Sequence, residues 1–179
     1  MNQEIILKTV VDVLNKHNIK YILGWGTLLG VVRDNDFLEW EPEDIDLAVF
    51  KPFWNEYPLY ENFVKDIYDA GLEIKDASYN YLCIWDGKIH LDLHWMEKDS
   101  ENYLSVKVTG EKQIFAKDSI LPIQIHKGYY YPALPSSVLR QLYGEDWRSP
   151  KPYDHTHLNT QKINNHKKII YPFIVSLKE

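Results

Sequence analysis

Two aspartates stand one residue apart at the start of an apolar run, in the segment "EPEDIDLAVF" (residues 41–50). The run predicts a β-strand. Successive side chains of a strand point to opposite faces, so Asp44 and Asp46 should share one face while Ile45 and Leu47 share the other. Two carboxylates at this spacing repel each other unless a positive charge lies between them. The segment therefore indicates either a cation site or an acidic edge that is solvated by water.

A second predicted strand carries a third carboxylate. In "KIHLDLHWM" (residues 88–96), alternation places His90, Asp92 and His94 on one face and the intervening apolar residues on the other. Three carboxylates suit Mg²⁺ or Mn²⁺, which take their remaining ligands from water and a substrate phosphate. A D-x-D pair alone fits a solvated edge better, but Asp92 and the turn described next favour a metal. We therefore predict that Asp44, Asp46 and Asp92 converge on one divalent ion, Mg²⁺ or Mn²⁺.

A glycine-containing turn upstream of the aspartates could bind substrate phosphates. "YILGW" (residues 21–25) predicts a short buried strand and "GTLLGVVRD" (residues 26–34) a helix, with Thr27 as its expected N-cap. Backbone N–H groups at a helix N-terminus bind phosphate oxygens, Gly26 permits close approach, and Thr27 can donate its hydroxyl. Arg33, near the end of this helix, could reach the same phosphates or form a surface ion pair. The sequence leaves both roles open.

The composition argues against several other classes of protein. The chain of 179 residues has a formal net charge of -6 at pH 7 and no long basic run, so we expect no nucleic-acid partner. The one cysteine, Cys83, lies in an apolar run and is expected to be a buried thiol. No stretch of about 18 apolar residues predicts a transmembrane segment. The amphipathic N-terminal segment does not resemble a signal peptide, and we expect a soluble, cytoplasmic protein.

The remaining patterns predict the elements that must position these residues. Apolar residues at helical spacing predict helices over residues 3–17 and 59–70, and Ser136 or Ser137 should cap a short helix over residues 135–144. Beyond the strand at 44–50, further strands are expected at residues 72–75, 79–85, 88–96, 103–108, 113–115, 121–125 and 128–131. "DGK" (residues 86–88) predicts a hairpin turn. Residues 145–158 are expected to be irregular, and 160–170 to form a last, basic helix.

Three segments together resemble the LicD family, whose animal relatives are fukutin and fukutin-related protein. "GWGTLLGVVRDNDFLEWEPEDIDLAVF" (residues 24–50) resembles the family's G-T-L-L-G-x-x-R stretch, which is followed by a Trp and an acidic cluster ending in D-x-D. "HLDLHWM" is similar to the strand that carries its third aspartate, and "LPSSVLRQLYGEDWRSPKPYDHTH" (residues 134–157) to its L-x-x-x-Y-G-x-x-W tail and histidine. The resemblance implies a nucleotidyltransferase-like α/β fold, a mixed sheet with helices packed on it. We expect one domain over residues 1–179, with 134–179 as a helical and irregular appendage.

The resemblance also implies roles for individual residues. By this resemblance the site consists of the metal ligands Asp44, Asp46 and Asp92, the phosphate-binding Gly26 and Thr27, the arginine Arg33, and a tail histidine, His155 or His157. Trp25 and Arg148 are further binding candidates, since Trp can stack on a base, a sugar or a choline-like cation and Arg adds positive charge. "WEPED" departs from the family's usual run of aspartates. The roles of Glu41 and Glu43 therefore stay open, and the sequence does not assign roles to His90, His94 and His157 either.

Members of this family transfer a phosphorylated alcohol, such as phosphocholine or ribitol phosphate, from a CDP-activated donor to a sugar hydroxyl. The resemblance therefore implies a metal-dependent phosphotransferase with a CDP-linked alcohol as donor and a glycan as acceptor. One aspartate, Asp92, could also accept the hydroxyl proton. Peripheral association with membrane-bound glycan machinery would follow from such an acceptor. Two alternatives remain: a nucleotidyltransferase that moves a nucleoside monophosphate from a triphosphate to a small molecule or protein, and a non-catalytic nucleotide-binding module.

Overall fold

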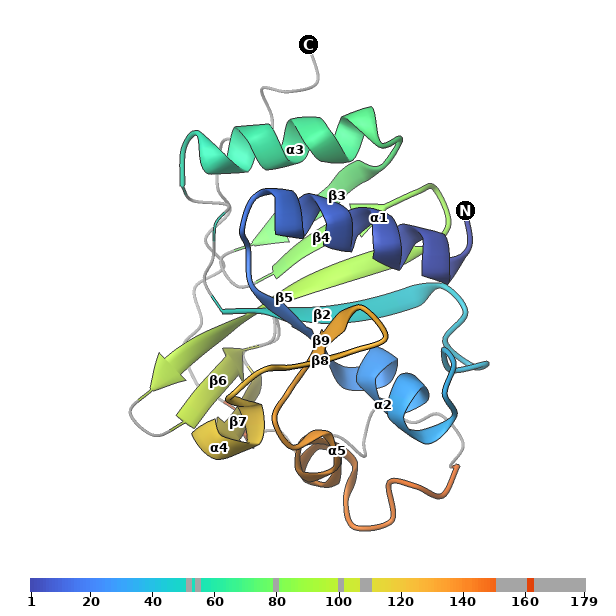
Figure 1. Cartoon of the computed structure of the whole chain (residues 1–179), viewed down its shortest axis with the longest axis vertical. Coiled ribbons are helices and arrows are strands. Elements are labelled where there is room, and N and C mark those ends of the chain that lie inside the picture. The colour runs from blue at the N-terminus through green and yellow to red at the C-terminus, as the bar shows by residue number, and fades with distance from the viewer. Residues whose placement is uncertain are drawn as a thin grey trace.

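A mixed β-sheet forms the centre of the structure, with helices packed on it (Figure 1). The computed structural model describes residues 1–50, 53, 56–78, 81–99, 102–106, 111–150 and 161–162. The elements are α1 (Gln3–Lys16), β1 (Tyr21–Leu23), α2 (Trp25–Arg33), β2 (Asp44–Val49), α3 (Leu59–Asp69), β3 (Glu73–Ser78), β4 (Tyr81–Trp85), β5 (His90–Asp99), β6 (Asn102–Val106), β7 (Glu111–Ala116), α4 (Lys117–Ile120), β8 (Gln124–His126), β9 (Tyr129–Tyr131), α5 (Pro135–Tyr143) and β10 (Gln161–Lys162). Helix α1 contacts α3, and α2 contacts α5.

Strand β5 organises the sheet, because its neighbours change along its length. Its first half lies between β2, which runs parallel to it, and β4, which runs antiparallel. Its second half pairs with β6, and the sheet continues through β7 to β10. Strand β1 extends the sheet beyond β2, β3 extends it beyond β4, and β8 and β9 form a separate hairpin. The two strands that carry the aspartates are therefore direct neighbours, with Asp46 opposite Asp92.

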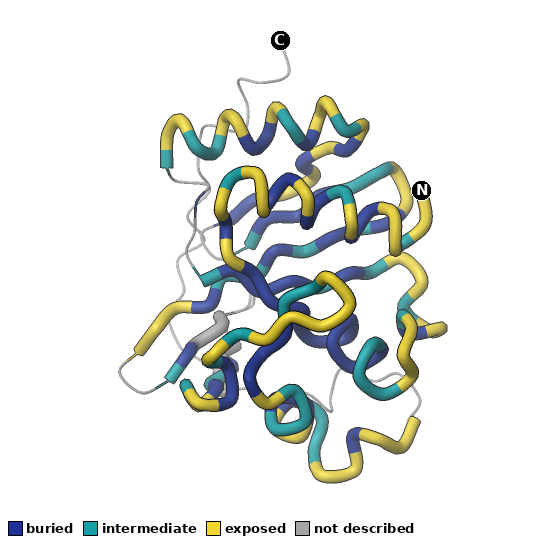
Figure 2. The backbone as a smooth tube through the Cα atoms, viewed as in Figure 1, coloured by how far each residue is buried: buried dark blue, intermediate teal, exposed yellow. Residues whose placement is uncertain are grey.

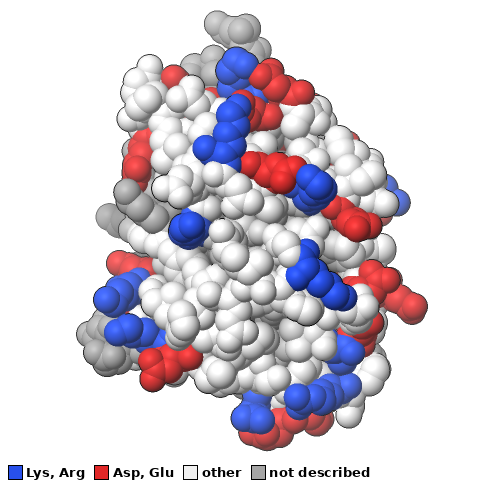
Figure 3. All heavy atoms as spheres, in the orientation of Figure 1, with Lys and Arg blue, Asp and Glu red and all other residues white. Residues whose placement is uncertain are grey.

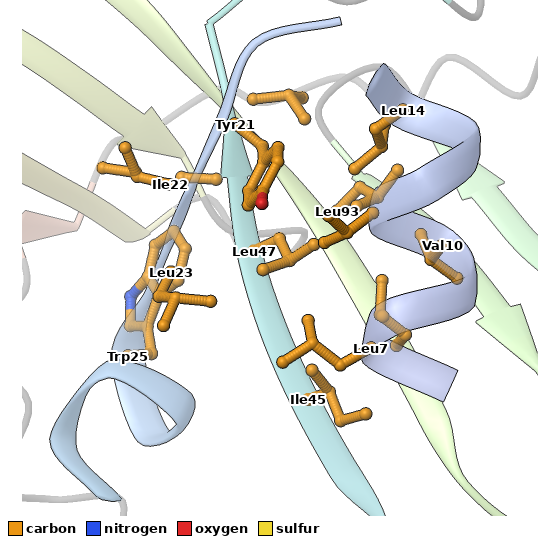
Figure 4. Close-up of a cluster of buried hydrophobic side chains, with 14 of the residues drawn as sticks. Leu7, Val10, Leu14, Tyr21, Ile22, Leu23, Trp25, Ile45, Leu47 and Leu93 are labelled. Atoms are coloured by element: carbon orange, nitrogen blue, oxygen red, sulfur yellow. The ribbon is translucent and has the colours of Figure 1, made fainter. Parts of the chain in front are cut away.

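One face of the sheet is apolar and packs against α1 (Figure 4). Helix α1 begins at an Asn2 N-cap, whose side-chain oxygen accepts a hydrogen bond from the Ile5 N–H. Its apolar stripe points toward Ile45 and Leu47 of β2 and Leu93 of β5, which are fully buried. Figure 2 shows these central strands as buried and the outer side of α1 as exposed. Because side chains alternate along a strand, the aspartates between these leucines must point to the opposite face.

The sheet confirms the expected fold class, and the principal helices and strands lie close to where the sequence predicts them. Two predicted helix caps are wrong. Helix α2 begins at Trp25 with Gly24 as its N-cap, so β1 ends before Trp25, and Thr27 lies within the first turn. Helix α5 has Leu134 as its N-cap and Pro135 at its first position, so neither Ser136 nor Ser137 caps it. A proline suits that position because the first N–H groups of a helix need no helical partner.

Two other differences lie in the C-terminal half. The predicted strand at 121–125 begins only at Gln124 in β8, and the short helix α4 precedes it. The basic helix predicted at 160–170 is wrong at residues 161–162, which form β10 against β7. The rest of that segment lies outside the described residues, as do residues 79–80 and 107–108 of two predicted strands. Cys83 is buried, as predicted.

The face that carries α1 and the β8–β9 hairpin has charged side chains of both signs interspersed (Figure 3). On α1, Lys8 pairs with Asp12 four residues later, and Lys16 pairs with Asp66 of α3. The Lys8–Asp12 pair is largely exposed and contributes little to stability, whereas Asp66 is only 16% exposed. Within the described residues, no helix combines the length and apolar composition that crossing a bilayer requires.

Replacing Leu93 should test how far the apolar face stabilises the fold. Leu93 is fully buried beneath α1, so Leu93→Ala removes buried apolar atoms and leaves a cavity. We expect the free energy of unfolding to fall by about 2–5 kcal/mol in chemical denaturation. Ile5→Ala, at a position on α1 that is 51% exposed, is the control and should change stability by less than about 1 kcal/mol. Equal losses in the two variants would contradict the packing described here.

Candidate functional site

The opposite face of the sheet carries three rows of side chains, set by the pairing of β2, β5, β4 and β3. The first row is Asp44, His90, Trp85 and Glu73; the second is Asp46, Asp92, Cys83 and Asp76; the third is Ala48, His94, Tyr81 and Ser78. Residues paired across neighbouring strands point to the same face, and strands lie about 4.8 Å apart. These residues therefore share one face of the sheet, with the row of Asp46, Asp92 and Asp76 in the middle.

Asp46, Asp92 and His94 form the centre of this surface. Each offers one ligand atom, and these atoms lie within 4.8 Å of one another. His94 Nε2 lies 3.1 Å from Asp46 Oδ1, and the Tyr81 hydroxyl donates a hydrogen bond of 2.9 Å to Asp92 Oδ1. Carboxylate oxygens are typical ligands of Mg²⁺ and Mn²⁺, and imidazole suits first-row transition metals. The side chains present therefore fit a divalent metal ion.

Two further carboxylates crowd this centre. Burial, and then the charges of Asp46, Asp92 and Glu41, raise the pKa of Asp44 to about 8. Burial and the neighbouring Asp46 raise the pKa of Glu41 to about 7, and burial also raises the pKa of Asp92. A metal ion in the centre would supply the positive charge that these groups lack.

The structure thus brings Asp46 and Asp92 together and sets Asp44 beside them. The third ligand atom that lies close to those of Asp46 and Asp92 belongs to His94, not to Asp44. Asp44 opens β2 and lies in the row of His90, one step along the strand from Asp46. Asp44 is close enough for the charges of Asp46 and Asp92 to raise its pKa. Metal ligation by the three aspartates stays a prediction.

The first turn of α2 is fastened to Asp46 by backbone and side-chain hydrogen bonds. The Gly24 N–H donates to the Asp46 carbonyl at 3.1 Å, and the Asp46 N–H donates to Thr27 Oγ1 at 2.8 Å. The Gly26 N–H donates to Asp46 Oδ2 at 3.2 Å, so the positive end of the helix dipole faces the carboxylate centre. Thr27 therefore anchors the helix to the strand instead of capping it. Phosphate binding by Gly26 and Thr27 stays a prediction.

The Glu41 carboxyl lies close to Gly26. A Cβ added at Gly26 would lie 2.0 Å from Glu41 Oε2 and 3.6 Å from Asp46 Oδ2. The absent side chain therefore makes room for the Glu41 carboxyl against the helix. The departure from the family pattern at "WEPED" thus places one of its glutamates at the centre of the site.

Trp25 links His94 of the centre to strand β7. Its indole Nε1 donates to Gln113 Oε1 of β7 at 2.5 Å, and its ring lies on that of His94 with centroids 4.4 Å apart. Trp25 is only 7% exposed, and its backbone has a positive φ of 35°. The Trp25 indole therefore contacts His94 in this structure. Stacking of Trp25 on a substrate stays a prediction.

The predicted arginines lie in other contacts. Arg33 pairs with Asp34 through Nε and Nη2 and lies over the ring of Trp40 at 4.8 Å. Of the two roles that the sequence left open for Arg33, the structure shows an ion pair, in which the Arg33 side chain is 7% exposed and that of Asp34 is 37% exposed. Arg148 lies over Trp147 and donates to Ser136 Oγ at 3.4 Å, near the start of α5. His155 and His157 lie outside the described residues.

Several residues of the centre were not assigned a role from the sequence. Alternation placed His94 on the face of Asp92, but nothing in the sequence showed that it would approach Asp46. Tyr81 reaches the centre because β4 pairs with β5 in the register that sets Tyr81 opposite His94. Gln113 comes from β7, 88 residues after Trp25. Burial raises the pKa of the Cys83 thiol to about 12, which disfavours the reactive thiolate at neutral pH.

The family model described as LicD/FKTN/FKRP, nucleotidyltransferase domain, matches residues 18–133. The chain belongs to the LicD family. The match spans α2, β2 and β5 and so includes every residue of the carboxylate centre. It confirms the family that the three sequence segments resemble.

Two solved structures are similar to this chain at low sequence identity. No match was found among curated protein sequences. The chain is similar to a crystal structure of ANT(2")-Ia in complex with adenylyl-2"-tobramycin, at 12% identity and a TM-score of 0.49, over 76% of this chain and 71% of that chain. It is also similar to a solution structure of this antibiotic-resistance factor, at 14% identity and a TM-score of 0.49, over 87% of this chain and 78% of that chain.

The raised pKa of Asp44 predicts how stability changes with pH. Its value rises from 3.8 to about 8, so the folded protein binds this proton more tightly than the unfolded chain does. That contribution to folding is complete below the unfolded pKa and is lost as the pH rises toward the folded value. In EDTA, the wild type should therefore lose about 1–3 kcal/mol between about pH 5 and pH 8 relative to Asp44→Asn, which does not titrate.

Chemical denaturation at both pH values measures this difference, and Mg²⁺ should reduce it at the higher pH. Parallel pH profiles for the wild type and Asp44→Asn would show that Asp44 carries no such shift.

The fit between Gly26 and Glu41 can be tested with a double-mutant cycle. Gly26→Ala puts a methyl group where the Glu41 carboxyl lies, so the end of the Glu41 side chain must move, and we expect a cost of at most about 1 kcal/mol. In the background of Glu41→Ala, which removes the clashing group, the same substitution should cost little. The coupling free energy from denaturant unfolding of the four proteins is the readout. Additive effects would mean that Glu41 does not occupy this space.

Proposed function

We propose that this LicD-family domain is a metal-dependent phosphotransferase. It moves a phosphorylated alcohol, phosphocholine-like or a polyol phosphate, from a CDP-activated donor to a sugar hydroxyl of a glycan. The observation that carries the proposal is the convergence of Asp46, Asp92 and His94 where β2 and β5 run in parallel, with the start of α2 facing them. Carboxylates that can hold a metal and helix N–H groups that can bind an anion together suit a phosphotransferase.

The reaction would proceed by direct transfer between oxygens. The acceptor hydroxyl oxygen forms a bond to the donor phosphorus that bears the alcohol. The bond from that phosphorus to the bridging oxygen breaks, and CMP leaves with this oxygen, so the product is a sugar–phosphate–alcohol diester. A divalent metal ion bound at the carboxylates would neutralise charge on the diphosphate and align the reacting groups.

The residues of the chain would divide the remaining tasks. Asp92 would take the proton of the acceptor hydroxyl. The Tyr81 hydroxyl holds one oxygen of Asp92 by its hydrogen bond. The Gly26 N–H, which donates to Asp46, is placed where it could turn to a phosphate oxygen. His94, whose ring contacts those of Trp25 and Tyr81, would fix the position of Asp46.

The nature of the donor follows from family membership, because no residue of the described site reads a cytosine base. Tests must therefore compare donors. The chain should be incubated with Mg²⁺ and CDP-choline, CDP-ribitol, CDP-glycerol or CTP, each with candidate sugar acceptors. Release of CMP from a CDP-alcohol supports the proposal. Pyrophosphate from CTP, with no CMP from any CDP-alcohol, would assign the domain instead to nucleoside monophosphate transfer.

Replacing Asp46 should abolish this turnover. Asp46→Asn removes one negative charge from the centre and weakens the contacts with Gly26 and His94, so CMP release should fall about 100-fold or more. Asp12→Asn, which makes the same change on an exposed turn of α1, is the matched control and should leave turnover unchanged. Both variants should keep the circular dichroism spectrum of the wild type. Full turnover in Asp46→Asn, with a metal still required, would show that the metal binds elsewhere.

A further inference from the structure

A second cluster lies on the same face of the sheet, one row away from the carboxylate centre. Lys75 Nζ lies 2.9 Å from His90 Nε2 and 4.7 Å from the centroid of the Trp85 ring. His90 and Trp85 are paired neighbours in the first row, with ring centroids 6.2 Å apart. We call Lys75, His90 and Trp85 the Lys75 cluster. An ammonium group only donates hydrogen bonds, so Nε2 of His90 is the acceptor.

A backbone irregularity puts Lys75 in this position. The pairing of β3 with β4 shifts between Ile74 and Asp76, and Lys75 is the extra residue of the resulting bulge. Bulges re-aim side chains and are common beside active sites. Lys75 is exposed, yet its ammonium is held by two contacts instead of extending freely into water. The strand is thus shaped to hold a cation at this place.

The charges on this face show why a cation matters here. The three rows contain five carboxylates, those of Asp44, Asp46, Asp92, Glu73 and Asp76, and no Lys or Arg. An anionic substrate would meet strong repulsion even with one divalent ion bound. Arg33, the predicted phosphate ligand, is engaged by Asp34, and Lys88 pairs with Glu43 at 3.7 Å. The ammonium group of Lys75, by contrast, lies against His90 and Trp85 of the first row.

We propose that the Lys75 cluster binds a phosphate group of the substrate. His90 and Asp92 are two residues apart on β5, roughly 7 Å along the strand. One phosphate of a diphosphate could therefore lie at the carboxylate centre while the other extends toward Lys75. The ammonium keeps its contact with Trp85 and donates its remaining N–H groups to phosphate oxygens. The identity of the anion as a nucleoside diphosphate derivative rests on the proposed function, but the anion site itself does not.

Binding of inorganic pyrophosphate tests the cluster without any turnover. The full chain, in Mg²⁺, is titrated with pyrophosphate by calorimetry, alongside Lys75→Met, Lys75→Gln and Lys75→Arg. Loss of one charged hydrogen-bonding partner should weaken binding about 10- to 100-fold in the Met and Gln variants. Lys75→Arg keeps the charge and should stay within about tenfold of the wild type. Lys65→Met, on the exposed side of α3, changes the net charge equally and should bind as the wild type does.

The outcomes separate this proposal from the assignment of function. Unchanged affinity in both neutral Lys75 variants, or no pyrophosphate binding by the wild type, would overturn the anion site. An equal loss of affinity in Lys65→Met would show an effect of net charge and overturn it as well. Lys75-dependent pyrophosphate binding in a chain that releases no CMP would keep the anion site while the CDP-alcohol donor fails. Melting temperatures of all variants, expected to be equal, show whether Lys75 has a merely structural role.

Discussion

The parallel, in-register pairing of β2 with β5 is the constraint on which the site depends. It sets Asp46 opposite Asp92, and the leucines that follow each aspartate point the other way, under α1. A shift of one residue in this register would turn the leucines to water and the aspartates into the core. The hydrophobic packing of α1 therefore holds the carboxylates together against their mutual repulsion. Burial of the apolar face provides the stabilising free energy that offsets this repulsion.

A second layer of contacts turns this row of charges into a defined geometry. Thr27 and Gly26 fasten the start of α2 to the backbone and carboxylate of Asp46. The rings of Trp25 and Tyr81 both contact the ring of His94. These groups are partly or fully buried, so their hydrogen bonds are strengthened by the low local dielectric. The centre is thus preorganised by residues that do not themselves offer ligand atoms.

The sequence was sufficient for the parts of the molecule that depend on local patterns. Alternation and apolar spacing predicted β2, β5 and α1, and the joint motif predicted the family. The caps of α2 and α5 were missed because tertiary contacts, such as that of Thr27 with Asp46, outweigh the local preference of Ser and Thr for cap positions. The approach of His94 to Asp46 and of Tyr81 to Asp92 depends on strand register, and the position of Lys75 depends on one bulge. Neither can be read from a single sequence.

The hydrogen bond between Trp25 and Gln113 determines how much of the chain a complete site requires. Every carboxylate of the centre lies before residue 93, but the acceptor of the Trp25 indole comes from β7. A chain cut after β5 would retain all the acidic groups and leave a buried indole N–H without its partner, at a cost in stability. The later hairpin of the sheet is therefore part of the scaffold of the site, and the boundaries of the working unit are wider than those of its motif.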